Sequence, residues 1–322
     1  MMKNKGILII IAILAMAIVA LVFQDIRKSS IEKRSGGDFI YDVEAYKKVS
    51  PTLISHKETR QLLLDCSKPG GVFVYNNTIY FTADDELYII AADGKQKKKL
   101  AFHSHINDLA VNDDAIYLLY DNHLEAYSHD KELIFNTEKE NEKSVFTSLV
   151  LKDGAIFVAD AGNKRILRYH TDGNPAGEFE GTGAKGENYG FIISSAYFDM
   201  DVNGDNELWI VNTGIHTMQH YSGNGDLKSS WKQTGINIEG FAGCCNPAHF
   251  AFLPDGRYIT SEKGMVRVKI YDQKGNFESV VAAPEKFMDN GHAPDVAALD
   301  NNTILLLDYD KKMLRFFEQL EK

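Results

Sequence analysis

Six short apolar runs each begin with a small or polar residue, and four of these six residues carry a carboxylate or an imidazole. The runs are GVFVY, DLAVN, SLVLK, DMDVN, HFAFL and DVAAL, and their first residues are Gly71, Asp108, Ser148, Asp199, His249 and Asp295. Carboxylate oxygens bind hard divalent cations, and an imidazole suits zinc or another transition metal. Asp199, His249 and Asp295 are therefore a candidate divalent metal site. The alternative is that these groups cap strand ends or bind water.

A second polar set closes the β-rich run that follows each of the later short runs. Its members are Asp160, Asn212, Glu262 and Asp308. Together with Asp108 and Ser148 they could face a ligand at the mouth of a channel, or they could serve as turn residues.

The three cysteines are placed in a related way. Cys244 and Cys245 are adjacent, Cys244 precedes His249 by five residues, and Cys66 precedes Gly71 by the same five. Four interpretations stay open. They are a disulfide from Cys66 to one of the pair, a strained bond within the pair, thiolate binding of a soft metal or haem-type cofactor, and free thiols that pack as small apolar residues.

An internal repeat predicts the elements that position these residues. The phrase GAIFVADAGNKRILRYHTDG consists of a β-rich run, a polar loop and a second β-rich run, and similar phrases recur five times, 37 to 52 residues apart. This spacing is typical of four-stranded blades round an axis. We predict an all-β, six-bladed β-propeller with the short runs as innermost strands. The last copy lacks its outer strand, so residues 46–56 are expected to supply it and close the ring.

The template phrase resembles the NHL repeat, a β-propeller family, through Asp160, Asn163 and Arg165. The fifth copy keeps Arg267 and has Ser261 where the repeat has Asp. The segment GCCNPAHFAFLPDGRYITSEKG also resembles a stretch of some exported bacterial propellers. The resemblance implies the propeller fold, and propellers of this kind serve both as binding platforms and as metal-dependent enzymes.

The amino-terminal region predicts a membrane anchor. Residues 6–23 form an unbroken apolar run after Lys3 and Lys5, long enough to cross a bilayer as a helix. We expect residues 1–23 to form an uncleaved signal anchor, with a cleaved signal peptide as the alternative. Residues 24–47 then form a polar linker and residues 48–322 the propeller, outside the cytoplasm in the periplasm or extracellular space.

Charge and motif content narrow the function. The chain has 35 Lys and Arg against 45 Asp and Glu, a formal net charge of −10, so nucleic acid is not an expected partner. No Gly-rich phosphate loop and no G-x-S-x-G elbow occurs in the sequence. We expect an envelope module that binds a protein or small ligand on its loop face. A metal-dependent hydrolase or lyase is the first alternative, and a thiol-based redox or cofactor-binding protein is the second.

Overall fold

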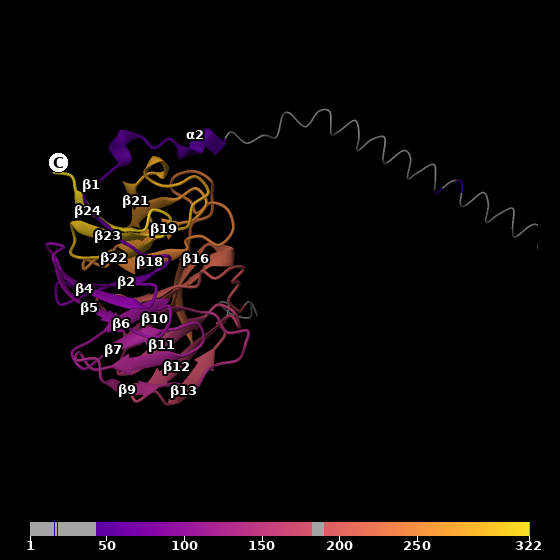
Figure 1. Cartoon of the computed structure of the whole chain (residues 1–322). Coiled ribbons are helices and arrows are strands. Elements are labelled where there is room, and N and C mark those ends of the chain that lie inside the picture. Colours follow the sequence, from indigo (N-terminus) through magenta and orange to yellow (C-terminus); the bar gives the residue numbers. More distant parts are fainter. Residues whose placement is uncertain (1–15, 17, 19–42, 182–189, 322) are drawn as a thin grey trace, which may run out of the picture. The chain divides into compact units, whose positions relative to one another are not determined.

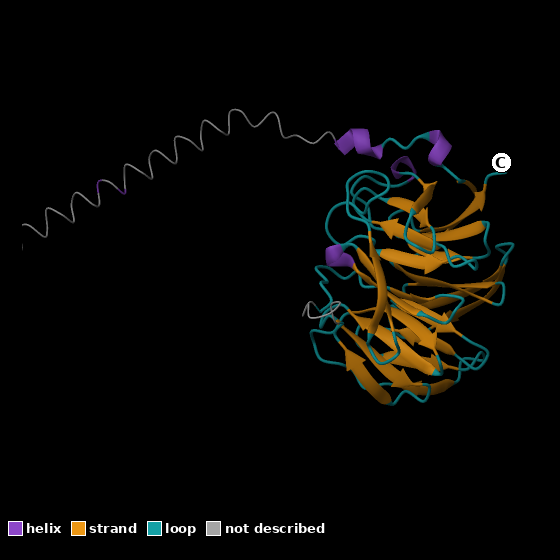
Figure 2. Cartoon of the chain, turned by 180° about the vertical axis from the view of Figure 1, so that it is seen from behind, coloured by secondary structure: helices purple, strands orange, loops and turns teal. Residues whose placement is uncertain are grey.

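The computed structural model describes residues 43–181 and 190–321, together with Met16 and Ile18. Within these residues the strands form six four-stranded antiparallel sheets (Figures 1 and 2). The innermost strands of consecutive sheets are neighbours, and the last also contacts the first, so the sheets close a ring. The predicted six-bladed β-propeller is therefore confirmed. It belongs to the compact unit Tyr46–Lys322.

The strands follow one order in every blade, from the innermost outward. Blade 1 contains β2 (Pro69–Tyr75), β3 (Thr78–Ala83), β4 (Glu86–Ala91) and β5 (Gln96–Ala101). Blade 2 contains β6 (Asp108–Val111), β7 (Ile116–Leu119), β8 (Leu124–Tyr127) and β9 (Leu133–Asn136). Blade 3 contains β10 (Phe146–Lys152), β11 (Ala155–Asp160), β12 (Arg165–His170) and β13 (Pro175–Phe179). Blade 4 contains β14 (Met200–Val202), β15 (Leu208–Asn212), β16 (Thr217–Tyr221) and β17 (Leu227–Lys232). Blade 5 contains β18 (His249–Phe252), β19 (Tyr258–Glu262), β20 (Arg267–Tyr271) and β21 (Phe277–Ala282). Blade 6 contains β22 (Asp295–Ala298), β23 (Thr303–Asp308), β24 (Met313–Gln319) and β1 (His56–Leu63). Short helices are α2 (Val43–Lys47), η1 (Pro51–Leu53), η2 (Thr213–Ile215) and η3 (Pro284–Lys286).

Tight turns join the innermost strands to the second strands. Asn76 and Asn77 have φ of 47° and 57°, and Asp153 and Gly154 have φ of 50° and 70°. Two consecutive residues with positive φ are the requirement of a type I′ hairpin, and Asn, Asp and Gly tolerate this conformation best. These two turns fix the register of β2 and β10, and hence which of their residues face the axis.

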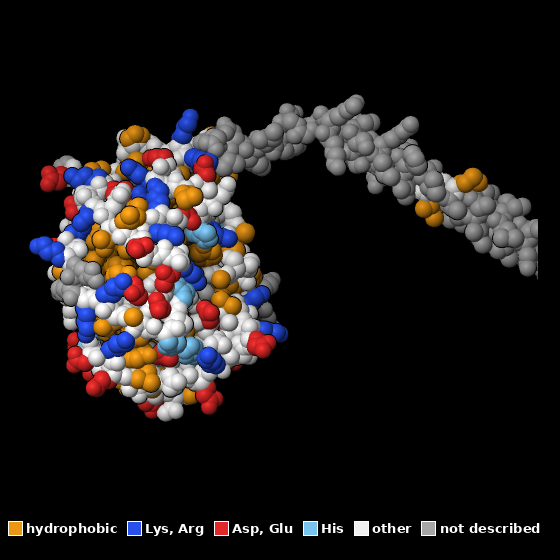
Figure 3. All heavy atoms as spheres, in the orientation of Figure 1, with side chains coloured by type: hydrophobic (Ala, Val, Ile, Leu, Met, Phe, Trp, Pro, Cys, Tyr) orange, Lys and Arg blue, Asp and Glu red, His pale blue; other side chains and the backbone are white. Residues whose placement is uncertain are grey.

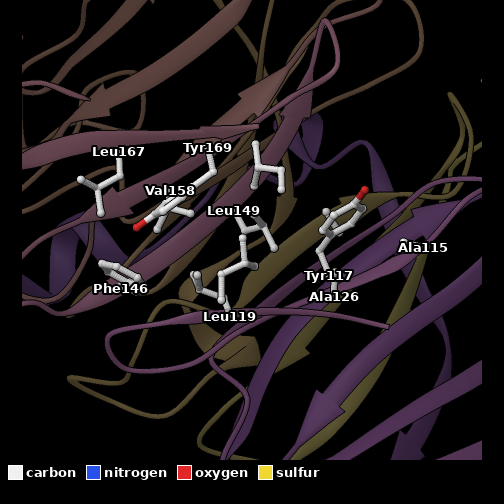
Figure 4. Packing of buried hydrophobic residues seen from close by; sticks show 12 residues of the cluster. Ala115, Tyr117, Leu119, Ala126, Phe146, Leu149, Val158, Leu167 and Tyr169 are labelled. Carbon is white, nitrogen blue, oxygen red and sulfur yellow. The ribbon is translucent and has the colours of Figure 1, made fainter. Parts of the chain in front are cut away.

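Adjacent blades are held together by stacked apolar faces, as the contact between blades 2 and 3 illustrates (Figure 4). Tyr117 and Leu119 of β7 pack with Leu149 of β10 and Val158 of β11. Each such side chain contributes about 1.5 to 3 kcal/mol when it leaves water. The blades therefore form a rigid wall that holds the innermost strands in place.

The ring is closed by a strand that begins later than predicted. Of the predicted segment 46–56, only His56 belongs to the outer strand of blade 6, which is β1 (His56–Leu63) and pairs antiparallel with β24. Pro51 has no N–H for a ladder and opens η1, after which Ile54 bridges to Val280 of blade 5. On β1, Glu58 binds the buried Arg315 of β24 with contacts of 2.7 and 2.8 Å. This ion pair specifies the observed closing segment.

The predicted anchor, residues 1–23, lies outside the described residues apart from Met16 and Ile18. None of the helices formed by the described residues is long and apolar enough to cross a membrane. Of the predicted linker 24–47, only α2 is described.

Candidate functional site

The structure brings Asp199, His249 and Asp295 together at the axis of the propeller. His249 begins β18, Asp295 begins β22, and Asp199 directly precedes β14. The Nδ1 atom of His249 lies 3.7 Å from Oδ2 of Asp199 and 3.7 Å from Oδ1 of Asp295. The candidate ligand atoms of the three residues lie within 4.8 Å of one another. We call these three residues the axial triad.

The aspartates also hold neighbouring blades together. Asp108, Asp199 and Asp295 each accept a backbone N–H from the innermost strand of the following blade. The donors are Leu149 to Asp108 Oδ2 at 2.7 Å, Phe250 to Asp199 Oδ2 at 2.9 Å, and Val72 to Asp295 Oδ2 at 2.8 Å. Ser148 plays the same part toward Met200, at 3.2 Å. The expected capping role is thus present, and it is compatible with metal binding because a carboxylate oxygen has two lone pairs.

His249 is the exception in this pattern. The N–H of Val296, the equivalent donor in the next blade, bonds to Oδ1 of its neighbour Asp295 at 2.8 Å. The Nε2 atom of His249 is buried and has no hydrogen-bond partner among the described residues. Buried polar groups without a partner are uncommon and costly. Among the aligned residues at the start of the innermost strands, His249 is therefore the one whose side chain is not used to join two blades and is available for another partner.

Burial and mutual repulsion keep protons on this cluster. Burial, followed by the charges of Asp295 and Asp199, raises the pKa of Asp108 well above its usual value. Burial raises the pKa of Asp295 to about 6, although His249 opposes the shift. Burial alone would lower the pKa of His249, but its contact with Asp199 and the charge of Asp295 outweigh burial and raise it. The cluster has more carboxylates than cations, so a bound cation would replace protons.

Two cavities meet at the axial triad. The channel cavity, of about 500 Å³, is lined by the innermost strands and includes Asp108, Ser148, Asp199 and Asp295. The mouth cavity, of about 560 Å³, is lined by the loops before those strands and includes His249. The triad thus forms the boundary between the cavities, with its imidazole on the mouth side.

The channel cavity contains one carboxylate that the sequence analysis did not include. Asp201 accepts the N–H of Phe252 at 2.9 Å, and burial raises its pKa to about 7. The signal was present in the run DMDVN, since residues two apart on a strand point to the same face.

The mouth cavity contains further groups able to bind or react. Nδ1 of His292 lies 2.7 Å from Oδ1 of Asp310, and the His292 side chain is 67% exposed. Because Asp310 accepts the Nδ1 proton, Nε2 of His292 remains free to act as a base. The rings of Tyr197 and Tyr309 lie 5.4 and 6.0 Å from that of His249. The sequence did not predict this group, because its members are single residues in loops and belong to no repeated pattern.

The axial triad fits a divalent metal ion. Zinc binds imidazole nitrogen at about 2.0–2.1 Å and carboxylate oxygen at about 2.0–2.2 Å, which places neighbouring ligand atoms roughly 3.0 to 3.7 Å apart. The two 3.7 Å separations from His249 meet the upper end of this range. One nitrogen and two carboxylates suit zinc or a metal such as manganese better than calcium.

The second polar set belongs to the interior, and none of its four residues is among those lining the two cavities. Asp160, Glu262 and Asp308 are buried and each binds an arginine of the next strand. The pairs are Asp160 with Arg165 at 3.2 Å, Glu262 with Arg267 at 2.8 Å, and Asp308 with Arg315 at 2.9 Å. Asp160, Glu262 and Asp308 therefore form ion pairs inside their blades, as alternatives to the ligand-facing and turn roles that the sequence left open.

The same contacts correct the comparison of the repeats. Glu262 is opposite Arg267 in the ladder, as Asp160 is opposite Arg165, so Glu262 and not Ser261 takes the acidic position of the fifth copy. Asn212 has no arginine partner of this kind in the described contacts; its side-chain oxygen accepts the N–H of Ile192 at 2.8 Å.

All three cysteines are free thiols in the structure. Cys244 is exposed, whereas Cys245 is 1% exposed. Cys66 packs against apolar residues of blades 1 and 6, and burial, followed by the charge of Asp84, raises the pKa of its thiol. A raised pKa disfavours the reactive thiolate. The arrangement agrees with the fourth interpretation, thiols that pack as small residues, for Cys66 and Cys245.

Among the six aligned residues of the innermost strands, Gly71 is the one without a side chain, because Asp108 occupies the space that a side chain would need. A Cβ atom at Gly71 would collide with Oδ1 of Asp108 and lie 3.0 Å from its Cα. We expect Gly71→Ala to lower the free energy of unfolding by about 1 to 3 kcal/mol, as overpacking does. Denaturant melts of this variant and of Gly204→Ala, where a Cβ meets only a carbonyl oxygen at 3.9 Å, provide the comparison. Equal stability of the two variants would contradict the close approach.

Comparison with known proteins gives the fold and no closer relationship. No protein-family model, that of the NHL repeat included, matches the sequence, and no curated protein does. Virginiamycin B lyase from Staphylococcus aureus is similar in structure, with a TM-score of 0.56 and 14% identity over 81% of this chain and 99% of that chain. A second structure, described as streptogramin B lyase, has a TM-score of 0.54 and 14% identity over 85% and 90%. A Bacteroides thetaiotaomicron protein of unknown function has a TM-score of 0.57 and 13% identity over 82% and 72%. At such identities the likeness shows that this chain shares the β-propeller fold.

Proposed function

We propose that this chain is a β-propeller that binds a small molecule in its mouth cavity, over a divalent metal ion held by the axial triad. The observation that carries the proposal is the position of His249, which lies on the mouth cavity with its Nδ1 atom 3.7 Å from a carboxylate oxygen of Asp199 and 3.7 Å from one of Asp295. The cavity volume of about 560 Å³ lies within the range of small-molecule sites.

The lining of the cavity suggests the class of ligand. Tyr197 and Tyr309 offer aromatic faces, and Lys68 and the metal would offer positive charge. A metal ion at the floor prefers an oxygen donor, so a small molecule with a carboxylate or phosphate group fits best. The triad residues would fix the ion, while the tyrosines orient the rest of the ligand.

The proposal is tested on the full chain purified without chelator. Elemental analysis should find at least one zinc or manganese ion per chain and one fewer in His249→Ala, and a thermal-shift screen should find carboxylate-bearing compounds that stabilise the metal-loaded chain only. A chain that binds no divalent ion at its axis, or that binds such compounds equally after metal removal, would disprove it.

Metal affinity should depend on pH. Asp295 has a pKa of about 6, and the pKa values of His249 and Asp108 are raised, so protons compete with the ion for the site. Below these pKa values a proton must leave as the ion binds. Affinity should therefore fall by roughly tenfold per pH unit for each displaced proton as the pH falls from 7 to 5. Calorimetric titrations at several pH values measure it, and a pH-independent affinity would exclude these ligands.

A membrane-anchored, extracytoplasmic location is part of the proposal. Its support is the apolar run 6–23 after Lys3 and Lys5. Reporter fusions to the carboxyl end, one active only outside the cytoplasm and one only inside, give opposite signals for the two orientations. The NHL type of the repeats also remains a proposal, supported by the contacts of Asp160 with Asn163 and Arg165.

A metal-dependent lyase or hydrolase is the second candidate function. The observation that favours it is the pair of His292 and Asp310 in the same cavity as His249, since a base beside a metal site is what such chemistry requires. One similar structure is of a catalytically inactive histidine-to-alanine variant of virginiamycin B lyase with quinupristin. Incubating the metal-loaded chain with quinupristin and with simple lactones and esters tests this candidate. Turnover lost in His292→Ala, with metal retained, would favour the enzyme over the binding module.

A further inference from the structure

A second group of possible metal ligands lies beside the mouth cavity, between blades 1 and 2. His103 is in the connection that follows β5, His123 is in the turn between β7 and β8, and Glu125 is on β8. The same connection and turn contribute His105 and Asp121 to the lining of the mouth cavity. This group, which we call the rim cluster, is separate from the axial triad in both sequence and lining residues.

The geometry of the rim cluster suits a metal ion. Nε2 of His123 lies 3.5 Å from Oε1 of Glu125, and Nδ1 of His103 lies 3.7 Å from Oε2 of Glu125. The three ligand atoms lie within 4.8 Å of one another. With metal-to-ligand distances of about 2.0 to 2.2 Å, tetrahedral zinc ligands are roughly 3.4 Å apart. A small closing movement of the exposed His103 would complete the arrangement.

Neighbouring aromatic residues hold the ligands in position. The ring of Tyr120 stacks on those of His103 and His123, with centroids 4.8 and 4.7 Å apart. The hydroxyl of Tyr127 donates to Oε2 of Glu125 at 2.7 Å, which leaves Oε1 toward His123. Such supporting contacts around metal ligands fix their orientation.

Burial supplies an independent indication. His123 and Glu125 are 8% and 7% exposed. A carboxylate is rarely buried without a cation that balances its charge, and the described contacts of Glu125 are with tyrosine and histidine side chains. His103 has an exposed side chain, so an ion can reach the cluster from solvent.

We infer that His103, His123 and Glu125 bind a zinc ion, with water or an outside ligand in the fourth position. Two imidazole nitrogens and one carboxylate oxygen form a donor set that zinc accepts, and calcium and magnesium prefer oxygen ligands throughout. The ion would join the connection after blade 1 to the β7–β8 turn of blade 2. Both segments form one wall of the mouth cavity, so zinc at the rim would fix the shape of that wall.

The test uses the full chain carrying His249→Ala, so that the axial triad cannot contribute. Calorimetric titration with Zn²⁺ should show one ion per chain and a higher melting temperature with zinc. Adding His103→Ala or Glu125→Gln should weaken zinc binding by more than about 100-fold. This exceeds the loss expected when a residue that only supports a metal ligand is changed. Adding His170→Ala, which removes an exposed histidine elsewhere, should change nothing.

Substituting Co²⁺ gives a readout of the ligands themselves. The visible absorption of cobalt bound to the His249→Ala chain should show the strong bands of a four-coordinate site, and these should disappear with His103→Ala. His103 is on the surface, so this variant should fold and melt as its parent without metal. Zinc binding unchanged by His103→Ala and Glu125→Gln, or no zinc binding by the His249→Ala chain, would overturn the rim site.

Discussion

Replacing Glu262 by Gln should lower the free energy of unfolding by about 3 to 5 kcal/mol, the cost of breaking a buried ion pair from one side. Glu262 is fully buried and binds Arg267 at 2.8 Å and Lys269 at 2.8 Å. The glutamine would leave two buried cations without a counter-charge. Burial already lowers the pKa of Lys269 to about 8, and the lysine can lose its proton, which keeps the cost from rising further.

Denaturant melts at pH 7 measure this effect, with Glu278→Gln as the matched control. Glu278 is an exposed acid that binds Arg257 at 3.3 Å, and such surface pairs contribute about 0 to 1 kcal/mol. Glu262 also accepts the N–H of Ala242 at 3.1 Å, in the loop that leads to His249. Equal losses in the two variants would show that Glu262 does not anchor blade 5.

The second large effect concerns metal binding by the axial triad. His249→Ala should weaken the affinity of the axis for zinc or manganese by more than about 100-fold, because it removes the single nitrogen ligand. His249 makes none of the blade-to-blade backbone bonds of the aspartates, so its loss should affect stability less than loss of Asp199. The variant can therefore be studied in folded form.

His292→Ala is the matched control for this measurement. His292 lines the same cavity but contacts Asp310 and is not part of the triad. Its removal should leave metal affinity unchanged. An equal loss of manganese affinity in both variants would mean that the ion binds elsewhere in the mouth cavity, and unchanged manganese affinity in His249→Ala would exclude the triad.

The repeated pattern of the sequence predicted the six blades and the aligned residues of the innermost strands, because each copy folds into the same four-stranded unit. Each blade repeats the same alternation of apolar and polar residues, and the aligned position lies within two residues of the start of each innermost strand. Asp108, Asp199 and Asp295 therefore had to lie in one layer. Their role in joining blades was harder to predict, because it depends on how far each blade is rotated against the next.

Errors arose where one residue decides between two registers. Ser261 and Glu262 are adjacent, and only the ladder shows that Glu262 is opposite Arg267. The closing strand begins at His56, and it includes Glu58, which binds Arg315. These two residues are 257 positions apart, so the local sequence could not reveal their contact. The rim cluster was missed since His103 and His123 are brought together only by the connection between blades 1 and 2.

The most direct test of the central claim is a crystal structure of the metal-loaded chain, with anomalous diffraction collected above and below the absorption edge of manganese. Manganese favours carboxylate ligands more than zinc does, so it tests the axis in preference to the rim. We predict an anomalous peak between the carboxylates of Asp199 and Asp295 and the imidazole of His249, within about 2.0 to 2.3 Å of each ligand atom. Well-ordered triad residues with no peak between them, at manganese concentrations that saturate calorimetric binding, would contradict the account.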